Sequence, residues 1–246
     1  MGQRGYILPP VIPYKDENPT VLAPVVTIGL IAVNVLAWLF VQGAGSGEAL
    51  AASVCQLGMI PAELFRTVPP GTRVPLGPGV ACVIDTPHYA TVITSMFMHG
   101  GWLHIIGNMW FLWVFGNNIE DSMGHMRFVV FYLLCGVAAA GTQLLADPHS
   151  RMPMVGASGA ISGVLGAYML IYPRVRVHTF VTLGFFVTSV ALPAYVLLGY
   201  WFVLQLLLGT VSRTTGGIAV WAHVGGFVAG VALIKLFANP APSRFD

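Results

Sequence analysis

Apolar residues are concentrated in six long stretches of the chain, separated by polar, charged or proline-rich segments. A helix needs about 17–25 mostly apolar residues to cross the hydrocarbon core of a bilayer. The stretches cover residues 24–41, 94–115, 127–146, 158–172, 192–209 and 218–237. The pattern therefore predicts an all-α polytopic membrane protein with six transmembrane helices. The first stretch exceeds the apolar region of about 7–15 residues in signal peptides, which favours a retained helix over a signal cleaved near Gly43-Ala44-Gly45.

The fourth stretch is too short to cross the membrane alone. At a rise of about 1.5 Å per residue, residues 158–172 span about 22 Å, whereas the hydrocarbon core is about 30 Å thick. Pro173 and Arg174 hold its far end at the interface, so Ser158 at its start lies below the opposite surface. The preceding segment 148–157 then dips into the membrane, where irregular backbone persists only if protein buries it or water reaches it. We therefore expect Ser158 to face a water-accessible cavity.

The remaining segments are expected to serve a single membrane domain, residues 21–238, with tails at 1–20 and 239–246. The proline-rich outer connection 42–93 is expected to be compact, with short interfacial helices. Residues 177–190, rich in valine and threonine, fit either an interfacial loop or an extension of the fifth helix.

The three cysteines fit this organisation. Cys55 and Cys82 share the outer connection, where an oxidising compartment would allow a disulfide. Cys135 stands alone in the third predicted helix and is expected to be a packing residue.

Composition excludes a soluble fold. Charged residues make up 8% of the 246 residues and hydrophobic ones 56%, whereas about 25% of residues in soluble domains are charged. The net charge of +2, without a dense basic cluster, excludes a nucleic-acid partner.

The cations instead indicate the orientation of the protein in the membrane, because lysine and arginine gather on the cytoplasmic side. If the N-terminus is cytoplasmic, seven lysine and arginine residues lie on the cytoplasmic side and four outside. The seven are Arg4, Lys15, Arg127, Arg174, Arg176, Lys235 and Arg244, and the four are Arg66, Arg73, Arg151 and Arg213. The prediction is a multi-pass protein of the cell (inner) membrane with both termini cytoplasmic.

Two polar residues within apolar segments carry the candidate chemistry. Ser158 opens the fourth helix and His223 comes about five residues into the sixth. Both helices run inward from the outer side in this topology, so the two side chains lie at a similar depth. A serine nucleophile needs a base within hydrogen-bond reach, and no Asp or Glu falls inside an apolar stretch except near its ends. We therefore predict a Ser158–His223 dyad. Ser162, about 6 Å deeper on the same face, is a competing nucleophile.

Two further features support this dyad. Small residues at every fourth position let transmembrane helices approach closely, and helices four and six each carry such a stripe: Gly159, Gly163 and Ala167, and Ala222, Gly226 and Gly230. Acyl transfer also needs donors for an oxyanion. The Ser158 backbone N–H, His104 and Asn108 are the candidates, and the last two lie one turn apart on one face of the second helix.

These residues stand in recognisable motifs. Ser158 lies in Gly-Ala-Ser-Gly, His223 in Ala-His-Val-Gly-Gly, and His104 with Asn108 in His-x-x-x-Asn. Glu120 lies in Gly-x-x-x-Glu-x-x-x-Gly, which ends at Gly124, and His99 precedes them. Together the motifs resemble those of the rhomboid family of intramembrane serine proteases, over about residues 95–237. The Trp-Arg pair that the family often carries in its outer loop is missing.

The resemblance implies a rhomboid-like six-helix bundle with a short, partly submerged fourth helix. It implies a serine endopeptidase in which Ser158 is the nucleophile, His223 the general base, and His104, Asn108 and the Ser158 N–H bind the oxyanion, without a cofactor or metal. The implied partners are membrane lipid and transmembrane protein substrates cut near the outer face; no oligomeric state follows.

Two other classes remain as alternatives. One is a catalytically silent relative that binds membrane helices, against which the intact Ser158 and His223 argue. The other is a transporter or channel, which would carry intramembrane charges or repeated broken helices that the sequence lacks.

Overall fold

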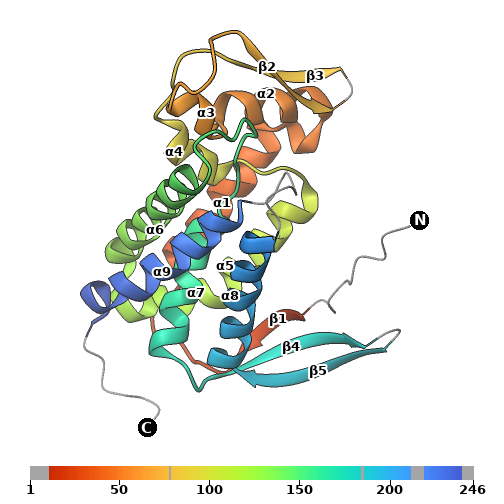
Figure 1. Cartoon of the computed structure of the whole chain (residues 1–246). Helices are drawn as coiled ribbons and strands as arrows, with labels where there is room; N and C mark the ends of the chain where they lie inside the picture. Colours follow the sequence, from red (N-terminus) through yellow and green to blue (C-terminus); the bar gives the residue numbers. More distant parts are fainter. Residues whose placement is uncertain (1–10, 78, 184–185, 212–218, 240–246) are drawn as a thin grey trace.

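A bundle of helices forms the centre of the computed structural model, which describes residues 11–77, 79–183, 186–211 and 219–239 (Figure 1). Its helices are α1 (Val25–Leu36), continued by the π-helical turn η1 (Ala37–Val41), α5 (Trp102–Met123), α6 (His125–Ala146), α7 (Ser158–Ile171), α8 (Ala194–Val211) and α9 (Val220–Phe237). Two of the described helices, α6 and α9, are long and apolar enough to cross a membrane by length and composition alone, and the apolar α1–η1, α7 and α8 are shorter. The predicted start of the sixth helix at residue 218 lies outside the described residues.

The second predicted helix, 94–115, is wrong at both ends. A short helix α4 (Thr91–Thr94) and a 3₁₀ turn (Ser95–Phe97) precede it, and α5 begins only at Trp102, after two glycines. The helix then continues through polar residues as far as Met123. Its polar end is satisfied by tertiary contacts: the buried Glu120 accepts hydrogen bonds from the Val26 and Thr27 N–H groups, each at 2.8 Å, and from the Thr27 hydroxyl at 2.7 Å. The polar residues after residue 115 therefore do not end the helix, because tertiary contacts satisfy them.

The chain is not all-α, because five strands among the described residues form two sheets. Strand β1 (Val11–Asp16) pairs antiparallel with β4 (Arg176–Leu183), which pairs antiparallel with β5 (Phe186–Pro193). Residues 177–183 and 186–190 thus lie in the paired strands β4 and β5 rather than in a loop or helical extension, as their β-branched content favours. Part of the predicted N-terminal tail is its third strand.

The three-stranded sheet is fastened to one end of the bundle. Asp16 accepts hydrogen bonds from the Tyr168 hydroxyl of α7 at 2.5 Å and from the Asn118 side chain of α5 at 2.8 Å. Burial raises the pKa of the Asp16 carboxyl above its ordinary value. Val177 and Thr179 of β4 are completely buried, so one face of the hairpin base packs on the helices.

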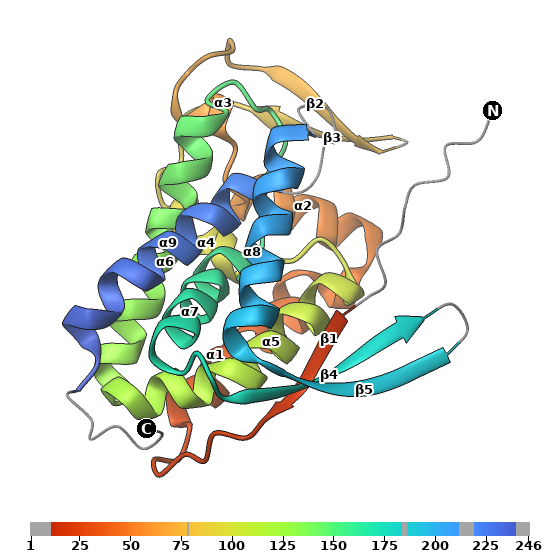
Figure 2. The same cartoon turned by 60° about the horizontal axis from the view of Figure 1, so that its bottom comes forward.

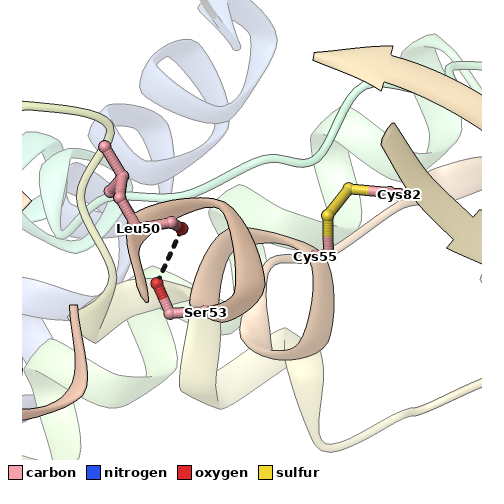
Figure 3. The surroundings of a disulfide bond; sticks show 4 residues. All are labelled: Leu50, Ser53, Cys55 and Cys82. Carbon is pink, nitrogen blue, oxygen red and sulfur yellow. Dashed lines mark hydrogen bonds between the residues drawn. A yellow bond between two sulfur atoms is a disulfide. The ribbon is translucent and has the colours of Figure 1, made fainter. Parts of the chain in front are cut away.

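The outer connection forms a small subdomain at the opposite end. It contains α2 (Gly47–Leu57), α3 (Pro61–Leu64) and the hairpin of β2 (Thr72–Gly77) with β3 (Val80–Ile84), around a core of its own. A disulfide joins Cys55 of α2 to Cys82 of β3 (Figure 3). By closing a loop across 27 residues, the bond stabilises the subdomain by roughly 3–4 kcal/mol in the chain-entropy account. Cys135 is buried and unpaired, as expected.

The elements that carry the described cations lie at these two ends (Figures 1 and 2). Elements at the end with β1, β4 and β5 carry five of them, Lys15, Arg127, Arg174, Arg176 and Lys235. The other end carries Arg66, Arg73 and Arg151. The segment of Arg151 is held against α3 there by a hydrogen bond of 2.8 Å from the Ala62 N–H to the Ser150 carbonyl. Arg4, Arg213 and Arg244 lie outside the described residues. The described cations are thus more numerous at the end with β1, β4 and β5, and the predicted membrane orientation rests on this difference.

Helix α7 is the centre of the bundle and contacts α5, α6, α8 and α9. Its small residues face α9 closely: a side chain at Gly226 would collide with the Gly159 carbonyl, and one at Gly230 with the Gly163 carbonyl. The two predicted small-residue stripes therefore do pack against each other. Their backbone contact sets the distance between the starts of α7 and α9.

Candidate active site

Ser158 is the first residue of α7, and the chain that leads into it is held in place. A β-bridge between Met59 and Met154 ties this chain to the outer subdomain, and the Gly156 N–H donates to the Ser95 carbonyl at 2.9 Å. The N–H groups of a first helical turn have no intrahelical partner. Ser158 therefore stands where free backbone donors and the positive end of the helix dipole meet.

His223 reaches Ser158 from α9. It lies in the first turn of that helix, which begins at Val220. Its Nε2 is 2.8 Å from the Ser158 Oγ. The two residues are 65 positions apart, so only the close contact of α7 with α9 brings them together.

Gly156 lies close beside this pair. The φ of Gly156 is +124°, a conformation that favours glycine. A side chain there would lie 2.7 Å from the His104 Nε2 and 3.6 Å from the Ser158 Oγ. The His104 Nδ1 accepts from the Gly100 N–H at 3.2 Å, so in the neutral ring Nε2 carries the proton. The position that a side chain at Gly156 would occupy therefore adjoins both the Ser158 hydroxyl and the His104 Nε2–H donor.

The ring of His104 is supported by His99, which lies edge-on to it at a centroid distance of 5.2 Å. His99 is completely buried, and Gln42 clamps its backbone: the side-chain amide donates to the His99 carbonyl and accepts from its N–H, both at 2.8 Å. The segment before α5 is thus a rigid support for the donor.

Asn108 lies one turn after His104 on α5 and is 7% exposed. Its Nδ2 is buried and has no hydrogen-bond partner within the described residues. An unpartnered buried donor is unusual and calls for an explanation. Asn108, His104, Ser158 and His223 line one cavity, so the free amide is available to a group that enters it.

The cavity measures about 1670 Å³. Its walls include residues of α5, α7, α8 and α9 around Ser158, and residues of α2 and the β2–β3 hairpin at the outer subdomain. It is large enough for several residues of a peptide as well as water. The predicted cavity at Ser158 is therefore present.

Ser162, the competing serine, is engaged elsewhere. Its hydroxyl donates to the Ser158 carbonyl at 2.6 Å, and the residue is 1% exposed. Among the described residues its oxygen contacts no base, in contrast to Ser158.

One neighbour of His223 was missed in the sequence. The Oε1 of Gln205, on α8, is 2.9 Å from the His223 Nδ1. Trp201, one turn earlier on α8, stacks at a tilt on the same imidazole at 5.9 Å between ring centroids. The sequence did contain a signal for this contact: Gln205 is a polar residue among leucines in an apolar stretch, where its carboxamide needs a hydrogen-bond partner.

Comparison with known proteins supports one family. The model of the rhomboid domain matches residues 86–240. RHOMBOID-like protein 5 of Arabidopsis thaliana is 31% identical over 149 residues, 58% of this chain and 42% of its own length. The rhomboid protease GluP of Bacillus subtilis is 29% identical over 162 residues, 66% of this chain and 29% of its own length. Rhomboid protein 1, mitochondrial, of Saccharomyces cerevisiae is 30% identical over 152 residues, 57% of this chain and 40% of its own length.

The match thus covers less than half of each of these relatives. The region that matches the rhomboid family model includes every residue of the candidate site from His99 to His223. Since the family model covers more than half of the chain, the protein belongs to the rhomboid family and has its helical membrane fold.

Proposed function

We propose that this protein is an intramembrane serine endopeptidase that cleaves transmembrane segments of membrane proteins near the outer face. Ser158 is its nucleophile and His223 its general base. The observation that carries the proposal is the 2.8 Å contact between the His223 Nε2 and the Ser158 Oγ, at the wall of a large cavity. Similarity to the rhomboid protease GluP supports it.

In the proposed reaction, His223 takes the proton of the Ser158 hydroxyl as Oγ attacks the carbonyl carbon of the scissile bond. The carbonyl oxygen becomes an oxyanion, which the Ser158 N–H, the His104 Nε2–H and the Asn108 amide bind. The C–N bond then breaks, and His223 gives its proton to the leaving amine. Water from the cavity hydrolyses the acyl ester with His223 again acting as base.

The proposal includes a topology. Six helices, α1–η1, α5, α6, α7, α8 and α9, form a single membrane domain over residues 21–238. The 14 residues of α7 span about 21 Å, and this short length supports a position of Ser158 below the membrane surface, with water reaching it through the cavity. The excess of cations at the end with β1, β4 and β5 supports the proposed orientation, with that end and both termini on the cytoplasmic side of the inner membrane.

A fluorophosphonate probe, which phosphonylates activated serines, tests this function directly. We expect the purified protein in lipid vesicles to be labelled on the peptide that carries Ser158, as mapped by mass spectrometry. Pre-labelled protein should no longer cut a reporter membrane protein. Labelling at Ser162 instead, or unchanged cleavage after complete labelling, would remove the assignment.

Asn108→Ala is expected to lower kcat by about 10- to 100-fold, because it removes one of several oxyanion donors. KM and thermal stability should change little, since the Asn108 Nδ2 makes no hydrogen bond with the described residues. Steady-state cleavage in vesicles measures both constants. A rate equal to that of the unmodified protein would make Asn108 a packing residue only.

A further inference from the structure

We propose that Gln205 is a positioning residue that holds His223 in the tautomer able to accept the Ser158 proton. The inference rests on the function proposed above and adds a third member, from a third helix, to the Ser158–His223 pair. Helix α8 supplies it, whereas α7 and α9 supply the other two. In sequence the pair had no carboxylate partner, so its base lacked an orienting group.

The two nitrogens of His223 have different partners. Nε2 faces the Ser158 Oγ at 2.8 Å, and Nδ1 faces the Gln205 Oε1 at 2.9 Å. A carboxamide oxygen only accepts, so the Nδ1 opposite it must carry the proton. A neutral imidazole has a single N–H, and Nε2 is therefore left as a lone pair directed at the serine. In the opposite tautomer, Nδ1 and the Gln205 Oε1 would face each other as two acceptors, and Nε2–H would donate to the Ser158 hydroxyl and could not accept its proton.

Gln205 is the only described partner of the His223 Nδ1. It is flanked by Leu204 and Leu206 in a helix that is otherwise almost entirely apolar. A carboxylate in this position would be costly to desolvate, whereas a carboxamide supplies an acceptor without a buried charge. When His223 takes the serine proton it becomes a cation, and the hydrogen bond to Oε1 becomes charge-assisted and stronger.

Trp201 restricts the ring in the remaining direction. It precedes Gln205 by one helical turn, so both side chains leave the same face of α8. Its ring lies 5.9 Å from that of His223 with an angle of 40° between the planes. Helix α8 thus contacts the imidazole at its edge, through Gln205, and at its face, through Trp201. The orientation of the base depends on this helix.

Gln205→Met tests the inference, because methionine keeps the length of the side chain and removes the acceptor. The matched control is Leu207→Met, which introduces the same residue on the same helix at a side chain that is 55% exposed. We expect kcat of Gln205→Met to fall by about 10- to 100-fold, with KM changed by less than about twofold. Leu207→Met should retain the full rate. Gln205→Glu restores an acceptor oxygen, charged or not, and should recover most of the lost rate.

The tautomer itself gives a readout that does not depend on cleavage. In protein labelled with ¹⁵N-histidine and embedded in lipid, solid-state NMR distinguishes Nδ1–H from Nε2–H, and His223→Gln identifies the signals of His223. We expect the Nδ1–H form in the unmodified protein and in Leu207→Met, and the Nε2–H form to become detectable in Gln205→Met. An unchanged Nδ1–H signal in Gln205→Met, or an unchanged kcat, would overturn the positioning role. If the protein failed to cleave while the tautomer changed as expected, the protease assignment would fail and the Gln205 contact would stand.

Discussion

Ser158→Ala and His223→Ala are each expected to lower kcat for cleavage of a transmembrane substrate by about 10⁴-fold or more. Either change removes half of the 2.8 Å contact in which the proton moves. The double variant should be no slower than the single ones, because residues that act as one unit are not additive. The residual rate should reflect the oxyanion donors and substrate binding alone.

Proteoliposomes that contain the protein and a reporter membrane protein provide the measurement, with products resolved by gel and mass spectrometry. Ser162→Ala is the matched comparison, since it removes the same hydroxyl one turn further along α7. We expect it to lose less than about tenfold, because its hydroxyl bonds only the Ser158 carbonyl among the described residues. Cleavage by Ser158→Ala at the original rate would show that another group is the nucleophile.

Gly226→Ala is expected to reduce kcat by about 100-fold or more without changing either proposed catalytic side chain. A methyl group at Gly226 would collide with the Gly159 carbonyl, which is backbone and has no rotamer to adopt. Helices α7 and α9 must therefore move apart at the level of Ser158. A displacement of about 1 Å between reacting groups can cost about 100-fold in rate.

Gly141→Ala provides the control for this prediction. Gly141 also lies in the interior of an apolar helix, α6, but a side chain there meets no atom within 4 Å. Both changes alter intrinsic helix propensity equally, so a difference between them reports the contact. Thermal unfolding in detergent separates a shifted helix from an unfolded protein. Full activity in Gly226→Ala would mean that the α7–α9 contact does not set the geometry of the pair.

Much of the bundle follows from hydrophobic pattern alone. Spanning helices satisfy their own backbone hydrogen bonds, so long apolar stretches report them directly. The predicted C-terminal end of α5, at residue 115, was wrong for the converse reason. The helix continues through Glu120, which is polar but is buried by contacts with α1. The pairing of β1 with β4 was missed because it joins residues more than 150 positions apart, which no local pattern contains. The pairing of β4 with β5 is local, and the β-branched residues of 177–190 were its available signal.

The candidate site divides in the same way. Ser158, His223, His104 and Asn108 are visible in sequence because polar residues are rare and costly in apolar segments. Their catalytic roles stay predictions until the variants are measured. Gln205 escaped notice because one carboxamide in a helix can simply face a neighbour, and only the position of α8 places it on the His223 Nδ1.

The amino-acid sequence by itself predicted which segments enter the membrane, and it determined which polar residues they carry and where small residues permit close packing. These properties depend on the transfer of each segment from water to lipid, which is local. The tertiary structure alone decided that the Ser158 Oγ meets the His223 Nε2, that Gln205 meets its other nitrogen, and that the backbone of Gly156 lies close to the His104 ring. Such contacts depend on the relative positions of several helices to within about 1 Å, and packing of the whole bundle sets those positions.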